Sequence, residues 1–284
     1  MELSKTDFEY VRDLVRQRSA MVLGDDKSYL VEHRLQGLAR QEGFESMHAL
    51  LSLLGKQTHG VLLQKVIEAI TINETSFFRD RSPFDSLRTA LLPNLLRQRS
   101  QPKSLNIWAA ACSTGQEPYS IAMVLSEFRA ALTNWNVRIL ASDISTAMLE
   151  RAAEGVYSEV EVSRGLSPAL LQKHFRKTEK GWQVKADIAR MVEYLRINLI
   201  EPWPVLPAMD VIFLRNVLIY FDVPTKKRIL ANVRRVLQPD GYLFLGNAET
   251  TLNLDDAFER VQLDRVSCYA LRARVRSTLG TVAT

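Results

Sequence analysis

From residue 105 onward the chain alternates short apolar runs with amphipathic helical stretches, and this alternation constrains the fold more than any other feature. Four apolar runs read as strands: "LNIWAAA", "NVRILASDI", a stretch within "PAMDVIFLRNVLIYF", and "GYLFLGNAE". Strands that are buried on both faces are near-continuously apolar, and helices between them connect parallel neighbours. The pattern therefore predicts an α/β fold, with a parallel, doubly wound sheet covered by helices on both faces.

The preceding part of the chain has helical periodicity throughout. Phe8, Val11, Leu14 and Val15 fall on one face of a predicted helix, and similar patterns continue to residue 70. Residues 1–72 are therefore predicted to form an all-helical N-terminal domain.

The remaining boundaries follow from breaks in these patterns. Residues 73–103 are predicted to be a linker that contains one connecting helix, with Pro83 in its first turn. Residues 104–284 form the predicted α/β domain, interrupted by an insertion at about 156–192. In this region "LSPALLQKHF" is a predicted helix, and "FRKTEKGWQVKADIARMVEYLRIN" suggests short antiparallel strands around a turn at Gly181. The end of the chain, "YALRARVRSTLGTVAT", is expected to be frayed and basic.

Composition excludes several classes of protein. No apolar run approaches the ~18 residues of a membrane span, and the N-terminus lacks an apolar signal core, so a cytoplasmic location without membrane insertion is expected. The net charge is +5, but residues 1–70 hold nine Lys and Arg against ten Asp and Glu, which argues against nucleic-acid binding. Two cysteines and four histidines, none paired at metal-ligand spacing, predict neither disulfides nor a bound metal.

The turn after the first predicted strand suggests a ligand. It runs from Ala110 to Gly115 and contains one glycine, where a dinucleotide-binding turn has three. Small residues let the backbone approach a ligand closely, and one glycine suits a ligand without phosphates. The alternative is a tight turn with no ligand. Cys112, within this turn, is interpreted as a small polarisable neighbour of the ligand rather than as a nucleophile.

Asp143 ends the second predicted strand, in the sequence "ILASDIS". A carboxylate at this place in a doubly wound sheet accepts hydrogen bonds from ribose hydroxyls. The alternative is that Asp143 caps the helix that follows. Together, the turn and the acid predict an adenosine-type ligand, most simply S-adenosylmethionine.

Five motifs then carry a family resemblance: "INETSFFRD", "WAAACSTGQEPYSIAM", "ASDIS", "RNVLIYF" and "PDGYLFLG". In this order they resemble the bacterial chemoreceptor glutamate O-methyltransferases, the CheR-type family, and the resemblance extends from about residue 6 to 272. It implies a helical N-terminal domain, a doubly wound S-adenosylmethionine-dependent methyltransferase domain and an inserted small antiparallel β subdomain. It also implies methyl transfer to glutamate side chains in the cytoplasmic domain of chemoreceptors, with S-adenosylhomocysteine as product.

The resemblance further implies the residues of the site. Arg79 and Tyr220 would face the reacting centre. The alternative for Arg79 is a domain-linking ion pair, and without the resemblance a core position is the better explanation of Tyr220. The implied cofactor contacts are Asn73, Thr75, Arg79, Glu117, Asp143, Asn198, Leu199, Arg215 and Asn216. Each of these positions holds the residue type that the family uses, which argues against an inactive copy.

Two stretches depart from the family pattern. Family members dock substrate helices with a basic helix, and here the corresponding "EHRLQGLARQEGF" offers Arg34 and Arg40, with Gly37 and Leu38 where enteric relatives are more basic. In the β subdomain, "FRKTEKGWQVKA" is shorter than the loop with which some relatives bind a C-terminal receptor pentapeptide. We therefore expect independence from that tether, and nothing in the sequence demands more than a monomer.

Two alternatives to this enzyme remain open. One is a regulatory module that binds S-adenosylmethionine in a signalling array without turnover. The other is a methyltransferase that acts on nucleic acid, which the near-neutral N-terminal domain disfavours.

Overall fold

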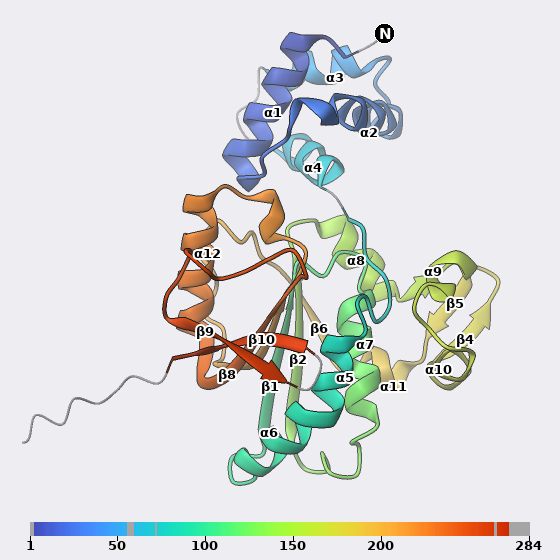
Figure 1. The fold of residues 1–284 in the computed structure, drawn as a ribbon. Helices are drawn as coiled ribbons and strands as arrows, with labels where there is room; N and C mark the ends of the chain where they lie inside the picture. The colour runs from blue at the N-terminus through green and yellow to red at the C-terminus, as the bar shows by residue number, and fades with distance from the viewer. Residues whose placement is uncertain (1–2, 56–59, 72, 264–265, 273–284) are drawn as a thin grey trace, which may run out of the picture.

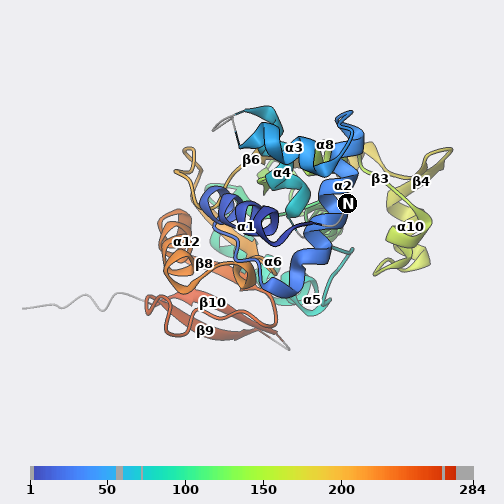
Figure 2. The ribbon, with the colours of Figure 1, turned by 90° about the horizontal axis from the view of Figure 1, so that it is seen from above.

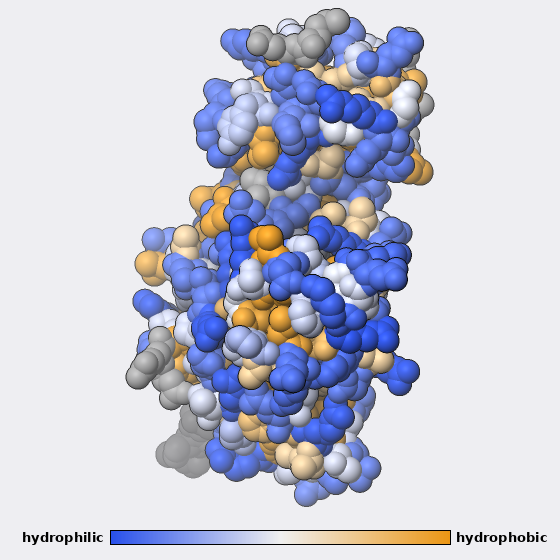
Figure 3. All heavy atoms as spheres, turned by 90° about the vertical axis from the view of Figure 1, so that its right-hand side faces the viewer, coloured by the Kyte–Doolittle hydropathy of each residue, from blue (hydrophilic) through white to orange (hydrophobic). Residues whose placement is uncertain are grey.

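The helical N-terminal domain forms a lobe above the sheet domain (Figure 1) in the computed structural model, which describes residues 3–55, 60–71, 73–263 and 266–272. The lobe comprises α1 (Lys5–Ser19), the short η1 (Asp25–Lys27), α2 (Ser28–Gln41), α3 (Met47–Leu54) and α4 (Val61–Ile70). Its core contains the predicted apolar face of α1, including Val11 and Val15, packed with Val31 and Leu35 of α2. Figure 3 shows this lobe joined to the larger body by a narrower neck.

The predicted connecting helix is present but is not regular throughout. It consists of α5 (Ser82–Ser86), one π-helical turn η2 (Leu87–Leu91) and α6 (Leu92–Gln98), and Pro83 lies in its first turn as predicted. Proline is tolerated there because the first amides of a helix have no intrahelical partner. Within the described residues, no helix is both long enough and apolar enough to span a bilayer.

The main sheet has seven strands in the order β6-β2-β1-β7-β8-β10-β9. The parallel strands are β1 (Ser104–Ala110), β2 (Asn136–Asp143), β6 (Val192–Arg196), β7 (Met209–Leu214) and β8 (Leu237–Leu245). The strands β9 (Phe258–Leu263) and β10 (Val266–Leu271) add an antiparallel hairpin beside β8, so the sheet is mixed. The order places β1 between β2 and β7, as in a doubly wound sheet.

The C-terminal hairpin corrects one prediction from the sequence. The stretch that begins "YAL" was expected to be frayed, yet Tyr269 to Leu271 belong to β10. Burial in the hairpin is partial, with only Phe258 buried in β9 and only Cys268 and Tyr269 in β10, so neither strand shows the continuous burial that marks a central parallel strand. The predicted basic end at 273–284 lies outside the described residues.

Helices cover both faces of the sheet, as the apolar runs predict. Ile107 and Ile139 belong to one core cluster with α5, α6 and α7 (Gln116–Ser126), whereas Trp108 and Leu140 belong to the other, with α12 (Val223–Val236) and the N-terminal lobe. Successive strand residues therefore face opposite layers. The remaining elements of this domain are α8 (Thr146–Glu154), α11 (Ala186–Ala189) and the 3-10 turn η3 (Leu218–Tyr220).

The inserted β subdomain projects from the body in two perpendicular views (Figures 1 and 2). It contains β3 (Val156–Tyr157), α9 (Glu159–Ser163), α10 (Pro168–His174), β4 (Phe175–Thr178) and β5 (Gly181–Val184), with the antiparallel order β3-β5-β4. The predicted antiparallel region was too long, because β6 runs parallel to β2 in the main sheet. β6 is an edge strand in which only Val192 is buried, and a strand so partly buried does not reveal which partner it has.

Candidate active site

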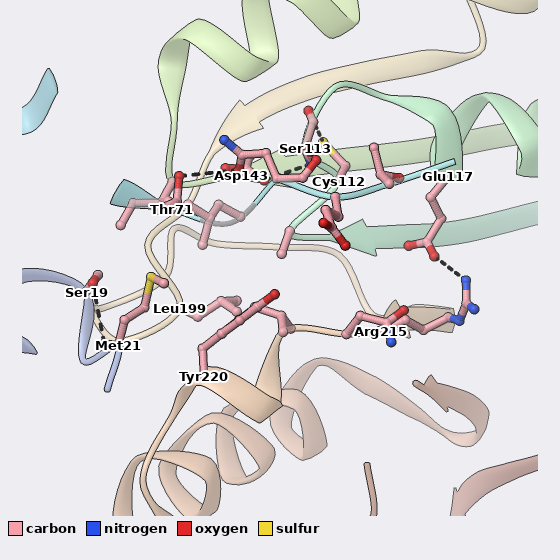
Figure 4. Close-up of a pocket in the computed structure, with 18 of the residues that line it drawn as sticks. Ser19, Met21, Thr71, Cys112, Ser113, Glu117, Asp143, Leu199, Arg215 and Tyr220 are labelled. Carbon is pink, nitrogen blue, oxygen red and sulfur yellow. Dashed lines mark hydrogen bonds and ion pairs between the residues drawn. The ribbon is translucent and has the colours of Figure 1, made fainter. Parts of the chain in front are cut away.

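The ten residues predicted to contact cofactor or substrate at the reacting centre line one cavity, whereas Arg34 and Arg40 do not. The cavity lies at the carboxyl ends of β1, β2, β6 and β7, where ligands bind in doubly wound sheets. Figure 4 shows Asp143, Glu117, Arg215 and Tyr220 around it. The ten are Asn73, Thr75, Arg79, Glu117, Asp143, Asn198, Leu199, Arg215, Asn216 and Tyr220.

The turn after β1 needs only one glycine, because the other two residues with left-handed backbone angles have small side chains. Ala111, Ser113 and Gly115 have φ angles of 56°, 50° and 92°. Only at Gly115 is there also no room for a side chain, since a Cβ atom there would lie 2.8 Å from the Cβ of Ala152. Burial raises the pKa of the neighbouring Cys112 thiol well above its usual range, so the thiol is protonated, as befits a packing residue.

Asp143 is buried and is held by two backbone amides. Its Oδ2 accepts from the Ser113 N–H at 2.8 Å, and its Oδ1 accepts from the Ser145 N–H at 3.0 Å. The helix cap of α8 is Ser145, whose hydroxyl accepts from the Met148 N–H, so the capping alternative for Asp143 is wrong. Burial raises the pKa of Asp143, and the backbone hydrogen bonds oppose this shift. Each carboxylate oxygen has a second lone pair for a ligand.

Arg215 is the buried electrostatic centre of the site, with a side chain only 1% exposed. Its Nη1 lies 2.8 Å from Oε2 of Glu117, and its Nη2 lies 2.7 Å from Oδ2 of Asp80. Nη2 also donates to the carbonyl oxygen of Arg79. Burial raises the pKa of Glu117, and the nearby Arg215 charge opposes this shift. Arg215 therefore fixes both the first turn of α7 and the segment that carries Arg79.

That segment has an unusual backbone. Phe78, Asp80 and Arg81 all have positive φ angles, of 49°, 63° and 31°. Non-glycine residues in this region are strained, and such strain concentrates at functional sites. Between them, Arg79 lines the cavity and donates from Nη1 to the carbonyl oxygen of Glu74 at 2.8 Å.

Tyr220 lies in η3 and is half-buried, with its side chain on the cavity, so it is not the core residue that its apolar neighbours suggest. Burial raises the pKa of its hydroxyl, which is therefore protonated at neutral pH. Its carbonyl oxygen accepts from the Val22 N–H at 2.8 Å, and Met21 forms a bridge with Phe221. The N-terminal lobe is thus attached directly to the loop that carries Tyr220.

Sequence reasoning missed this contribution of the N-terminal lobe. Ser19 and Met21 line the cavity (Figure 4). Asn198, after β6, donates from Nδ2 to the carbonyl oxygen of Arg18 at 2.9 Å. Glu68 of α4 accepts from the Ser145 hydroxyl at 2.9 Å, at the N-terminus of α8. No local signal in the sequence indicates such contacts, because each joins segments that are far apart in the chain.

The two predicted docking arginines lie elsewhere. The Arg34 Nη1 donates to the carbonyl oxygens of Ala69, Ile70 and Thr71, so this side chain completes the last turn of α4. Arg40 is exposed and lines a separate cleft in the N-terminal lobe. The docking role of both residues stays a prediction.

A doubly wound sheet, a close turn of small residues after β1 and a buried acid at the end of β2 are the features of a nucleoside-binding domain. Comparison with models of protein families identifies which family the chain belongs to. The model described as the CheR methyltransferase SAM-binding domain matches residues 73–267, and the model described as the CheR methyltransferase all-alpha domain matches residues 6–71. The chain belongs to the CheR methyltransferase family.

Relatives of similar length support this placement. The Pseudomonas aeruginosa protein named chemotaxis protein methyltransferase 1 is 41% identical, over 92% of this chain and 96% of its own. Chemotaxis protein methyltransferase Cher2 of Pseudomonas putida is 38% identical, with the same coverage of 92% and 96%. Chemotaxis protein methyltransferase 1 of Vibrio cholerae is 37% identical, over 94% of this chain and 98% of its own.

Proposed function

We propose that this protein is a protein-glutamate O-methyltransferase, which transfers a methyl group from S-adenosylmethionine to glutamate side chains in the cytoplasmic domain of chemoreceptors. Membership of the CheR family and the names of its relatives support the substrate class. The observation that carries the proposal is the single cavity that gathers all ten predicted residues.

The lining of this cavity suits the cofactor. The buried Asp143 carboxylate retains acceptor capacity for ribose hydroxyls, beside a turn of small residues that admits a ligand close to the backbone. The amino-acid moiety of the cofactor carries a positive ammonium group and a negative carboxylate. The cavity offers Glu117 for the first and Arg79 for the second. Asn73, Thr75, Asn198, Leu199, Arg215 and Asn216 complete the proposed set.

The cofactor supplies a methyl group activated by a positively charged sulfur, and the protein supplies position. A glutamate side chain has a pKa of about 4.3, so at neutral pH the nucleophile is ionised and needs no catalytic base. In our proposal the Arg79 guanidinium orients either this carboxylate or that of the cofactor, and the protonated Tyr220 hydroxyl donates to the substrate carboxylate without adding charge. Holding the reactants in line supplies roughly 7–11 kcal/mol in well-oriented systems.

The test is methyl transfer from labelled S-adenosylmethionine to membranes that bear chemoreceptors of the same organism, followed by alkali. Carboxyl methyl esters release the label as volatile methanol, which is the expected result. Label that survives alkali would place the methyl group on nitrogen or another stable acceptor and refute the glutamate assignment. Tight cofactor binding without incorporation would favour the regulatory module, and nucleic-acid binding that weakens steeply with salt would favour the third alternative.

Asp143→Asn is expected to weaken binding of S-adenosylhomocysteine about 10- to 100-fold in titration calorimetry, since hydrogen bonds to charged groups contribute about 1.5–3 kcal/mol. The amide keeps the shape of the side chain, but one of its two polar atoms can no longer accept from a backbone amide or a hydroxyl. Asp256→Asn, at an exposed position, is the control and should leave the affinity unchanged. An affinity within about twofold of the wild type would contradict the role of Asp143.

We also propose that the protein acts without a receptor pentapeptide tether, as a monomer. The turn between β4 and β5 contains only Glu179 and Lys180, which supports the first part. Calorimetric titration with a pentapeptide from the C-terminus of a tethered receptor is expected to give no binding heat. Micromolar affinity would refute this proposal and leave the reaction itself unaffected.

A further inference from the structure

Glu249 follows β8 and places a nearly buried carboxylate against three backbone amides. Its Oε2 accepts from the N–H of Asn216 at 2.8 Å and from that of Gly246 at 2.6 Å, and its Oε1 accepts from Ile219 at 3.2 Å. The residue is only 9% exposed. Hydrogen bonds to a charged acceptor are about twice as strong as neutral ones, so this carboxylate joins the end of β8 firmly to the loop after β7.

The backbone amides that Glu249 accepts from lie on the loop that carries Asn216 and Tyr220. Asn216 has a left-handed backbone with φ of 58°, and Tyr220 directly follows Ile219. Asn216 and Tyr220 line the cavity, and Glu249 itself is not among the lining residues. The carboxylate therefore acts on the cavity through the loop that it holds and through its charge, which raises the pKa of Tyr220 and of Glu117.

Gly246 makes room for this arrangement. Its φ angle is not in the left-handed region, so its conformation does not require glycine. A Cβ atom there would instead lie 2.6 Å from Nδ2 of Asn216 and 2.8 Å from Oε2 of Glu249. Glycine at this position thus leaves space for both the carboxylate and Asn216, and an alanine would crowd both.

We propose that Glu249 is a positioning residue for methyl transfer, which sets the Asn216–Tyr220 loop and thereby the place of the Tyr220 hydroxyl. The inference rests on the proposed function, in which Tyr220 faces the reacting centre. A carboxylate is needed because all three partners are donors, and a side-chain amide must direct its own N–H at one of them.

The test is a double-mutant cycle between Glu249→Gln and Tyr220→Phe, measured as kcat for methyl transfer. Glu249→Gln alone is expected to lower kcat about tenfold, but less than about twofold when Tyr220 is already phenylalanine, since residues that act together are not additive. Fully additive losses would overturn the proposal, because a merely structural role has no reason to depend on the Tyr220 hydroxyl. Glu259→Gln, at an exposed position on β9, is the matched control and should leave kcat unchanged.

Two further measurements cover the cases in which Glu249→Gln does not fold or the wild type transfers no methyl group. Gly246→Ala crowds this carboxylate and Asn216 of the same loop, so it too should show the cycle with Tyr220→Phe, including when Glu249→Gln fails to fold. If the wild type transfers no methyl group, the proposed function has failed, and the cycle is then measured in S-adenosylhomocysteine affinity with Asn216→Ala. Coupled losses would support the positioning role, and additive losses would overturn it.

Discussion

Arg215→Met is expected to cost about 3–5 kcal/mol of the free energy of unfolding, the usual consequence of removing one partner from a buried ion pair. The guanidinium, 1% exposed, bridges the carboxylates of Asp80 and Glu117, and methionine leaves both without their cation. Small domains are stable by about 5–15 kcal/mol in total, so the loss is a large fraction. Urea unfolding of both proteins measures it.

The loss should depend on pH. Burial raises the pKa of Glu117 and Arg215 lowers it, so the variant raises this pKa further. When an acid has a higher pKa in the folded state than in the unfolded chain, the folded state loses stability as the pH rises from the unfolded-state pKa through the folded-state pKa. We therefore expect a smaller deficit at about pH 5 than at about pH 8.

The control for Arg215 is an exposed ion pair. Arg129 and Asp187 lie 2.8 Å apart with side chains 65% and 51% exposed, so Arg129→Met should cost at most about 1 kcal/mol. A loss at Arg215 no larger than at Arg129 would contradict the bridging role.

The central part of the fold was predictable because it depends on local patterns. Continuous apolar runs identified four of the five parallel strands, β1, β2, β7 and β8, and the position of Asp143 at the end of β2 followed from the strand boundary. The edge elements were harder. β6 and the β9–β10 hairpin are only partly buried, so they lack the long buried runs of the central strands and do not reveal which neighbour they pair with.

The family motifs named ten residues that line one cavity, but not the contacts that these residues make. The family motifs named Arg215, yet its partners Glu117 and Asp80 are 98 and 135 residues away in the chain. Ser19 and Met21 reach the cavity only because the N-terminal lobe packs on the loops of the other domain. Composition and periodicity report burial along one element, whereas these contacts depend on how separate elements meet.

Arg79→Ala is expected to lower kcat/KM for methyl transfer about 10²- to 10³-fold, the usual effect of removing one preorganised donor from an active site. Arg79 lines the same cavity as Tyr220 and Glu117, and its charge lowers the pKa of both against the effect of their burial. The main-chain carbonyl that accepts from Arg215 remains in the variant, so the fold should tolerate the change. Arg164→Ala, at an exposed position, is the control.

Two measurements on Arg79→Ala decide which carboxylate the side chain serves. If Arg79 orients the substrate glutamate, kcat falls while S-adenosylhomocysteine affinity changes less than about threefold, because that interaction is absent from the cofactor complex. If it holds the carboxylate of the cofactor, the affinity falls by a similar factor to kcat/KM. Arg79→Lys should recover part of the loss in either case, since it keeps the charge without the planar fork of donors. Activity within about threefold of the wild type would exclude Arg79 from the reacting centre.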